Sequence, residues 1–135
     1  MVEHTGDLAV RLTAPDLAGL VVAGIEALRS VLFEGEPGPG AEPAVARARV
    51  RGIDREDALV QSLAEALHAL QSGALYPQEI RAHTTPAHEI EIELEGVRVD
   101  GVHVRQVDEI KAVTYHQVAI TTRDGALETL VVFDV

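Results

Sequence analysis

The chain has 135 residues, the size of one ordinary domain, so we expect a single domain over residues 1–135. Its 22 acidic and 11 basic residues leave a net charge of −11, which argues against direct binding to nucleic acid or to an anionic membrane. Cysteine is absent, no apolar run is long enough to cross a bilayer, and residues 1–7 do not resemble a signal peptide; together these features favour a cytoplasmic protein without disulfides.

The first part of the chain predicts a strand, a helix and a loop. Apolar and other residues alternate over residues 8–12, which is typical of a half-buried strand. Thr13 is expected to cap the following helix, whose apolar residues recur with helical spacing over residues 17–32. Gly24 lies on the apolar face of this helix and indicates close packing against another element. Residues 34–43 are rich in Gly, Pro and Glu and predict an exposed loop.

A second helix is predicted in the middle of the chain, after a weak strand signal over residues 44–50. Asp54 is a good capping residue, and acidic residues follow it where the helix dipole favours them. The apolar stripe runs from Leu59 to Leu70, and Gly73 follows as a terminator.

The last part of the chain is predicted to be β-structure. Residues 89–95 alternate Glu with Ile or Leu, which indicates a strand with one buried and one acidic face, ending at Gly96. Further strands are predicted over residues 110–115, 118–122 and 127–134, with Asp124 and Gly125 forming a hairpin turn. The expected fold is α+β: a two-layer sandwich with two helices packed on one face of a largely antiparallel sheet.

Common catalytic and nucleotide-binding motifs do not occur in the sequence. His83, His88 and Glu89 allow two interpretations, a small metal cluster or an exposed connection between strands, and we favour the exposed connection. His68 falls between the apolar positions of its helix and is expected at the surface.

Three blocks of sequence carry a family resemblance. They are Glu-His-Thr-Gly-Asp at residues 3–7, Lys-Ala-Val-Thr-Tyr-His at residues 111–116 and Val-Val-Phe-Asp-Val at residues 131–135, with Gly96 and Asp100 at matching spacing before the second block. In this order and at these separations the blocks resemble the archease family over the whole chain. The sequence departs from the family pattern at Gly6, Gln61, Ser62, Ala64, His103 and Val104.

The resemblance implies an accessory protein rather than an enzyme. Archeases assist the RtcB-type RNA ligase of tRNA splicing or RNA repair, helping it take guanylate from GTP and turn over repeatedly. GTP would then be used by the partner ligase and not bound by this chain alone. The resemblance also implies a divalent metal held by Asp7, Asp134 and Val135.

The residue chemistry agrees with such a metal, because carboxylate and main-chain oxygens are hard donors. They suit Ca²⁺ first, with Mg²⁺ or Mn²⁺ as alternatives. A purely structural role remains open, in which Asp7 caps a turn and Asp134 is an exposed acid.

The block at residues 111–116 contains further candidates. Lys111 is either an edge lysine or a contact to a partner's phosphate or carboxylate, and we favour the contact. His4 and His116 either orient the metal ligands from the surrounding layer of residues or have structural roles. Thr114 and Tyr115 are expected to pack in the sheet.

Two other functions stay open. One is a chaperone-like modulator of a tRNA-modifying enzyme, such as a tRNA methyltransferase. The other, which we disfavour because no general base is evident, is a small metal-dependent hydrolase. The acidic surface suits docking by charge complementarity to the basic surroundings of an RNA channel, with neither RNA nor membrane contacted directly.

Overall fold

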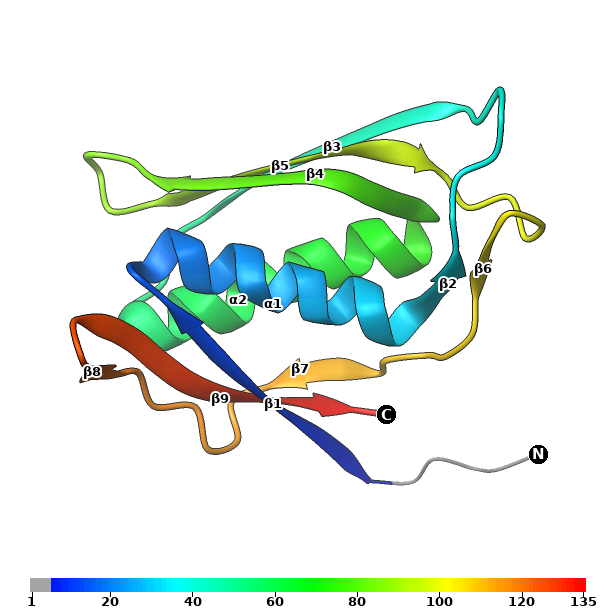
Figure 1. Ribbon diagram of the computed structural model, residues 1–135. Coiled ribbons are helices and arrows are strands. Elements are labelled where there is room, and N and C mark those ends of the chain that lie inside the picture. Colours follow the sequence, from blue (N-terminus) through cyan, green and yellow to red (C-terminus); the bar gives the residue numbers. More distant parts are fainter. Residues whose placement is uncertain (1–5) are drawn as a thin grey trace.

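In the computed structural model, which describes residues 6–135, two helices lie between a four-stranded and a three-stranded antiparallel sheet (Figure 1). The α+β class is confirmed, and every strand pair in the described part of the chain is antiparallel. The sequence does not foresee the division of the strands into separate sheets. No helix within residues 6–135 is long and apolar enough to span a membrane.

The four-stranded sheet has β9 at its centre. β9 pairs with β1 along one edge, and with β7 and β8 along the other. The strands are β1 (Asp7–Ala14), β7 (Ala112–Thr114), β8 (Thr121–Arg123) and β9 (Ala126–Asp134). Asp124 and Gly125 join β8 to β9 with φ of 52° and 79°, the left-handed conformation of a type I′ hairpin turn, as predicted.

The remaining strands form the three-stranded sheet, in the order β3-β5-β4, and a short two-stranded ribbon. The strands of the sheet are β3 (Pro43–Val50), β4 (Leu75–Thr84) and β5 (Ile90–Arg98); those of the ribbon are β2 (Phe33–Gly35) and β6 (Val104–Gln106). β2 includes the first residues of the predicted loop 34–43, which become a strand because β6 pairs with them.

The first helix, α1 (Leu17–Leu32), begins later than predicted. Asp16, not Thr13, caps it, and the Asp16 carboxylate accepts a 2.8 Å hydrogen bond from Gly19 N. Thr13 stays in β1, because that strand pairs with β9 through Ala14. The predicted cap lies three residues too early, although Asp is as good a capping residue as Thr.

The second helix consists of α2 (Arg55–Leu67) and a final π turn, η1 (His68–Ser72). Asp54 caps it as predicted, accepting a 2.8 Å hydrogen bond from Asp57 N. Gly73 follows the last turn, and its N–H bonds to the carbonyl of His68, five residues back.

The core lies between the helices and the two sheets. A Cβ at Gly24 of α1 would lie 2.5 Å from Leu63 of α2, so the close packing expected at this glycine is present. Ser62 is fully buried in α2, and its hydroxyl has no hydrogen-bond partner within the described residues.

The strand β5 does not end at Gly96, contrary to the prediction, but continues to Arg98. Gly96 pairs with Pro77 at a register shift of β4, and a Cβ at Gly96 would overlap the Tyr76 carbonyl oxygen. This glycine permits a close approach of two backbones rather than terminating a strand.

Candidate functional site

The strand register places Asp7 opposite Asp134, at the end of the sheet where β1 begins and β9 ends. The hydrogen bond of 3.2 Å from Val135 N to Gly6 O flanks this position, so the two aspartates form a non-hydrogen-bonded pair. In such a pair the side chains lie on the same face and closer together than in the alternating pairs. Two carboxylates from opposite ends of the chain are therefore neighbours.

Lys111 lies at the same end of the sheet, on the other side of β9. Its backbone N–H donates a 2.7 Å hydrogen bond to the carbonyl of Asp134, immediately before β7 begins. The Lys111 side chain is exposed, and the ion pairs within residues 6–135 all involve arginine or histidine instead. The structure thus brings together Asp7, Asp134, Val135 and Lys111.

The two candidate histidines, His4 and His116, differ in what the structure describes of them. His4 lies outside the described residues 6–135. Ala112 pairs with Asp134 and Thr114 with Val132, so β7 runs away from the aspartate pair, and the exposed His116 follows two residues after its end. His116 itself lies in the turn after β7, and its role in orienting the metal ligands stays a prediction.

The donor chemistry at the paired aspartates fits a hard divalent cation. Asp7 is exposed and Asp134 is partly exposed, so solvent molecules can complete a coordination shell. Like charges directly opposite each other destabilise a strand pair, and neither aspartate joins an ion pair within the described part of the chain. Within residues 6–135 no group of three or more His, Cys, Asp or Glu side chains is arranged to hold a metal. A cation here would depend on two carboxylates plus main-chain oxygens and water.

The exposed connection expected at His83, His88 and Glu89 is shorter than predicted, because β4 continues through Thr84 and includes His83. His83 is exposed on β4, and its Nε2 lies 3.0 Å from Glu91 of the neighbouring strand. His88 lies in the turn between β4 and β5, with φ of 60°. His68 is exposed, as predicted.

Tyr115 does not pack inside the sheet, contrary to expectation. It is 56% exposed, and its hydroxyl donates a 2.7 Å hydrogen bond to Asp57 near the start of α2. This bond raises the pKa of Tyr115. Hydrogen bonds from Gln61, from the N–H of Ile53 and from Tyr115 lower the pKa of Asp57. Tyr115 therefore ties the segment after β7 to the second helix.

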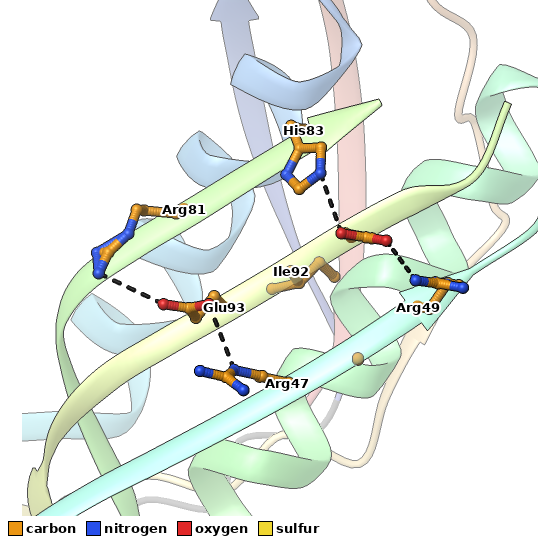
Figure 2. A pocket seen from close by; sticks show the side chains of 8 residues that line it. Arg47, Arg49, Arg81, His83, Ile92 and Glu93 are labelled. Atoms are coloured by element: carbon orange, nitrogen blue, oxygen red, sulfur yellow. Dashed lines mark hydrogen bonds and ion pairs between the residues drawn. The ribbon is translucent and has the colours of Figure 1, made fainter. Parts of the chain in front are cut away.

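A large open hollow of about 520 Å³ lies on the outer face of the β3-β5-β4 sheet (Figure 2). Glu93 on the central strand lies 3.3 Å from Arg47 Nε and 3.4 Å from Arg81 Nη2. Glu91 pairs in the same way with Arg49 and with His83. Each arginine that lines the hollow already faces a carboxylate, which does not favour a phosphate there.

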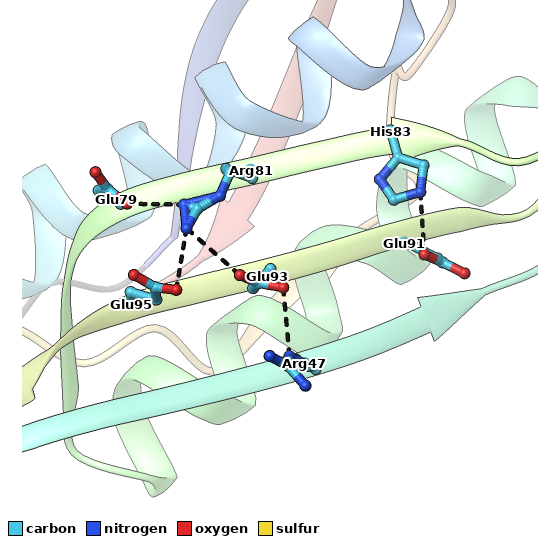
Figure 3. A network of polar contacts seen from close by, with 7 residues as sticks. All are labelled: Arg47, Glu79, Arg81, His83, Glu91, Glu93 and Glu95. Carbon is cyan, nitrogen blue, oxygen red and sulfur yellow. Dashed lines mark hydrogen bonds and ion pairs between the residues drawn. The ribbon is translucent and has the colours of Figure 1, made fainter.

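These contacts extend into a ladder across the three strands (Figure 3). Arg81 also lies 2.7 Å from Glu79 and 3.0 Å from Glu95. The hydrogen bond and the charge of Glu95, followed by the charge of Glu79, raise the pKa of Arg81. We call this set of residues the charge ladder; it comprises Arg47, Arg49, Glu79, Arg81, His83, Glu91, Glu93 and Glu95.

Asp100 has a structural role in the turn before β6. Its Oδ1 accepts hydrogen bonds of 2.8, 2.8 and 3.1 Å from the N–H groups of Val102, His103 and Val104. Its Oδ2 lies 2.9 Å from the Nδ1 of His103. The contact to His103, followed by the backbone bonds, holds the pKa of Asp100 well below its usual range. The spacing of Asp100 in the sequence motif therefore reflects a tightly bonded turn.

Comparison with known proteins identifies the family of this chain. A model of the archease protein family (MTH1598/TM1083) matches residues 1–135. The chain belongs to the archease family. No curated protein matches the chain.

Two solved structures resemble this archease over nearly its full length. An archease from Thermotoga maritima (TM1083), described as a possible chaperone, is 21% identical with a TM-score of 0.69, covering 100% of this chain and 95% of that one. Protein 1598 of Methanobacterium thermoautotrophicum is 22% identical with a TM-score of 0.70, covering 99% and 96%. At these identities the likeness shows the fold.

One residue at the site has no signal in the sequence. Gln71, in the π turn η1, forms two hydrogen bonds with the backbone of Ile110, directly before Lys111. Neither periodicity nor a motif singles it out, because its partner lies 39 residues away along the chain.

Proposed function

We propose that this archease is a metal-binding accessory protein that activates an RtcB-type RNA ligase, by promoting guanylylation of the ligase and its multiple turnover. The protein itself catalyses no reaction in this proposal, and the ligase alone uses GTP. The fold and the family support an accessory role, and the aspartate pair supports the metal.

A single observation carries the proposal: the pairing of Asp7 with Asp134, beside the backbone of Lys111. Folding places two carboxylates opposite each other in a strand pair, an arrangement that costs stability unless a cation offsets the repulsion. Asp7, Asp134 and an oxygen of Val135 would hold a Ca²⁺, Mg²⁺ or Mn²⁺ ion. When bound, such an ion neutralises the pair and presents positive charge at the sheet end.

Lys111 provides a second positive group at that end of the sheet. An exposed lysine side chain on a chain of net charge −11 suits a contact with a carboxylate or phosphate of the partner. The remaining acidic surface would attract the basic surroundings of an RNA ligase's substrate channel. Cationic and anionic surfaces of the archease would thus face different parts of the ligase.

A calorimetric titration tests metal binding, and a ligation assay tests activation of the ligase. Ca²⁺ and Mn²⁺ should bind the wild-type protein, and Asp7→Ala should reduce the affinity at least tenfold. Glu36→Ala, which removes an exposed acid from the loop after β2, is the matched control and should bind as the wild type does. Equal binding by Asp7→Ala and the wild type would remove the aspartate pair from the metal site.

The ligation assay uses multiple-turnover conditions with an RtcB-type ligase and GTP. Addition of the wild-type protein should raise the number of products per ligase above one. Lys111→Ala should abolish this stimulation with an unchanged melting temperature, since surface substitutions usually alter stability by less than about 0.5 kcal/mol. Full stimulation by a normally melting Lys111→Ala protein would remove Lys111 from the contact.

A chaperone-like modulator of a tRNA-modifying enzyme is the second candidate, favoured by the description of the Thermotoga maritima relative as a possible chaperone. Large exposed apolar side chains occur on several separate elements rather than on one. They are Leu8, Val45, Ile53, Val102, Val107 and Tyr115. Protection of a tRNA methyltransferase from aggregation, without stimulation of the ligase, would favour this second function.

A further inference from the structure

The segment that leads into Lys111 is held by a side chain from the second helix. Gln71 Nε2 donates a 2.8 Å hydrogen bond to Ile110 O, and Ile110 N donates a 2.9 Å bond to Gln71 Oε1. The carboxamide therefore contacts Ile110 as a neighbouring strand would, through one donor and one acceptor. Ile110 is not part of a strand, so its backbone groups depend on this side chain within the described structure.

The backbone at Lys111 is held at two neighbouring points, Ile110 and the N–H of Lys111 itself. The side chain of Ile110 is fully buried, which anchors the residue before Lys111 in the core. The N–H of Lys111 itself bonds to Asp134 O at 2.7 Å. Gln71 and Lys111 also line one open hollow of about 290 Å³ between the second helix and β7. The helix end, Lys111 and the aspartate pair thus form one connected arrangement.

The helix around Gln71 is irregular in a way that fits this contact. Residues His68–Ser72 form a π turn, which is rare, costs helix stability and frequently occurs at functional sites. The bidentate bond to Ile110 is made from within this turn. The irregular turn and the side-chain bond are separate observations on the same residue.

We infer that Gln71 is a positioning residue, which holds Lys111 beside Asp134 and so presents the lysine side chain to the partner ligase. The step from position to partner rests on the proposed function. The step from Gln71 to the Lys111 backbone rests on the hydrogen bonds alone.

The chain contains a single lysine, so labelling with [¹⁵N]lysine produces one backbone amide signal, that of Lys111. [¹⁵N]Phenylalanine adds Phe33 and Phe133 as references for general unfolding. In Gln71→Leu, exchange of the Lys111 amide with solvent should accelerate at least tenfold relative to both phenylalanines. Gln61→Leu removes a glutamine that bonds to Asp57 on the same helix, and should leave the ratio unchanged.

Gln71→Glu keeps the acceptor for Ile110 N–H and removes the donor, so its acceleration should be intermediate. This variant decides the question if Gln71→Leu does not fold. An unchanged ratio in both variants would overturn the inference. Neither the ligase nor a metal is needed, so failure of the proposed function is seen separately, as absence of stimulation by the wild type.

A double-mutant comparison tests the link to the ligase. If Gln71 acts through Lys111, Gln71→Leu should reduce ligase stimulation at least fivefold in the wild-type background. In a background in which Lys111→Arg retains part of the stimulation, the further loss should be smaller than this. Equal fold losses in both backgrounds would show a merely structural role and overturn the inference.

Discussion

The carboxylates of the two sheets have different neighbours. On the outer face of the β3-β5-β4 sheet, Glu93 lies between Arg47 and Arg81 of the flanking strands (Figure 3). Glu91 likewise lies between Arg49 and His83 (Figure 2). At the end of the β1-β9-β7 sheet, Asp7 faces Asp134 instead, and the ion pairs of residues 6–135 include neither.

The charge ladder is a structural use of charge, and the proposed function gives the aspartate pair a different use. In the charge ladder every carboxylate of the central strand is offset by a neighbour, so the chain itself completes the arrangement. Such exposed ladders also discourage edge-to-edge pairing with other chains. The aspartate pair has no such neighbour among the ion pairs of residues 6–135, and the cation of the proposed function would take that place. Under the proposed function, a local excess of negative charge therefore indicates the metal site better than the number of acidic residues does.

The largest expected effect comes from disrupting the pairing of β4 with β5, the two strands that carry most of the charge ladder. The aspartate pair in the other sheet stays intact. Gly96→Ala places a Cβ against the Tyr76 carbonyl and should destabilise the fold by about 3 kcal/mol. Urea denaturation measures the loss. The control Gly40→Ala meets no atom within 4 Å, and should lose only about 1 kcal/mol from its φ of +73°. Equal losses in the two variants would contradict the close approach at Gly96.

A smaller, pH-dependent effect is expected at Asp100, whose carboxylate is offset by hydrogen bonds rather than by arginines. Its pKa is lowered in the folded state, so its stabilising effect is complete above the unfolded pKa of about 4. The effect is lost as the pH falls through the lower folded pKa. Asp100→Asn should therefore be less stable than the wild type at pH 7, with a smaller deficit at pH 3. Carbon NMR should show the pKa of Asp100 rising in His103→Ala.

The smallest expected effects have opposite signs and compare the two sheets directly. Asp134→Asn removes a like-charge contact and should stabilise the metal-free protein by about 0.5 kcal/mol at low salt. Glu93→Gln removes the partner of Arg47 and Arg81, and should destabilise it by about 0.5 kcal/mol. Both substitutions remove one negative charge, so the change in overall self-repulsion is the same.

Urea denaturation at low salt and in 1 M NaCl measures both variants. Salt should reduce both effects, because the screening length falls to about 3 Å at 1 M. Ca²⁺ should stabilise the wild type but not Asp134→Asn. Changes of the same sign in the two variants would mean that the aspartate pair and the ladder are electrostatically alike.

Much of the local structure follows from the sequence, because local causes produce it. The alternation in β5, the apolar stripes of the helices, the cap at Asp54 and the turn at Asp124 each depend on a few neighbouring residues. The predictions are wrong where pairing with a strand far away along the chain determines the local structure. Pairing with β9 keeps Thr13 in β1, and Gly96 continues a strand because Tyr76 passes close by.

The sequence by itself determined the α+β class, the order of most elements and, through its three motif blocks, the resemblance to archeases. Only the tertiary structure decided that Asp7 and Asp134 occupy opposite positions of one strand pair, and that Gln71 holds the segment before Lys111. The physical reason is the range of the interactions. Propensity, periodicity and capping act over one or two turns of chain, whereas strand register joins residues from opposite ends and is settled only when the sheet forms.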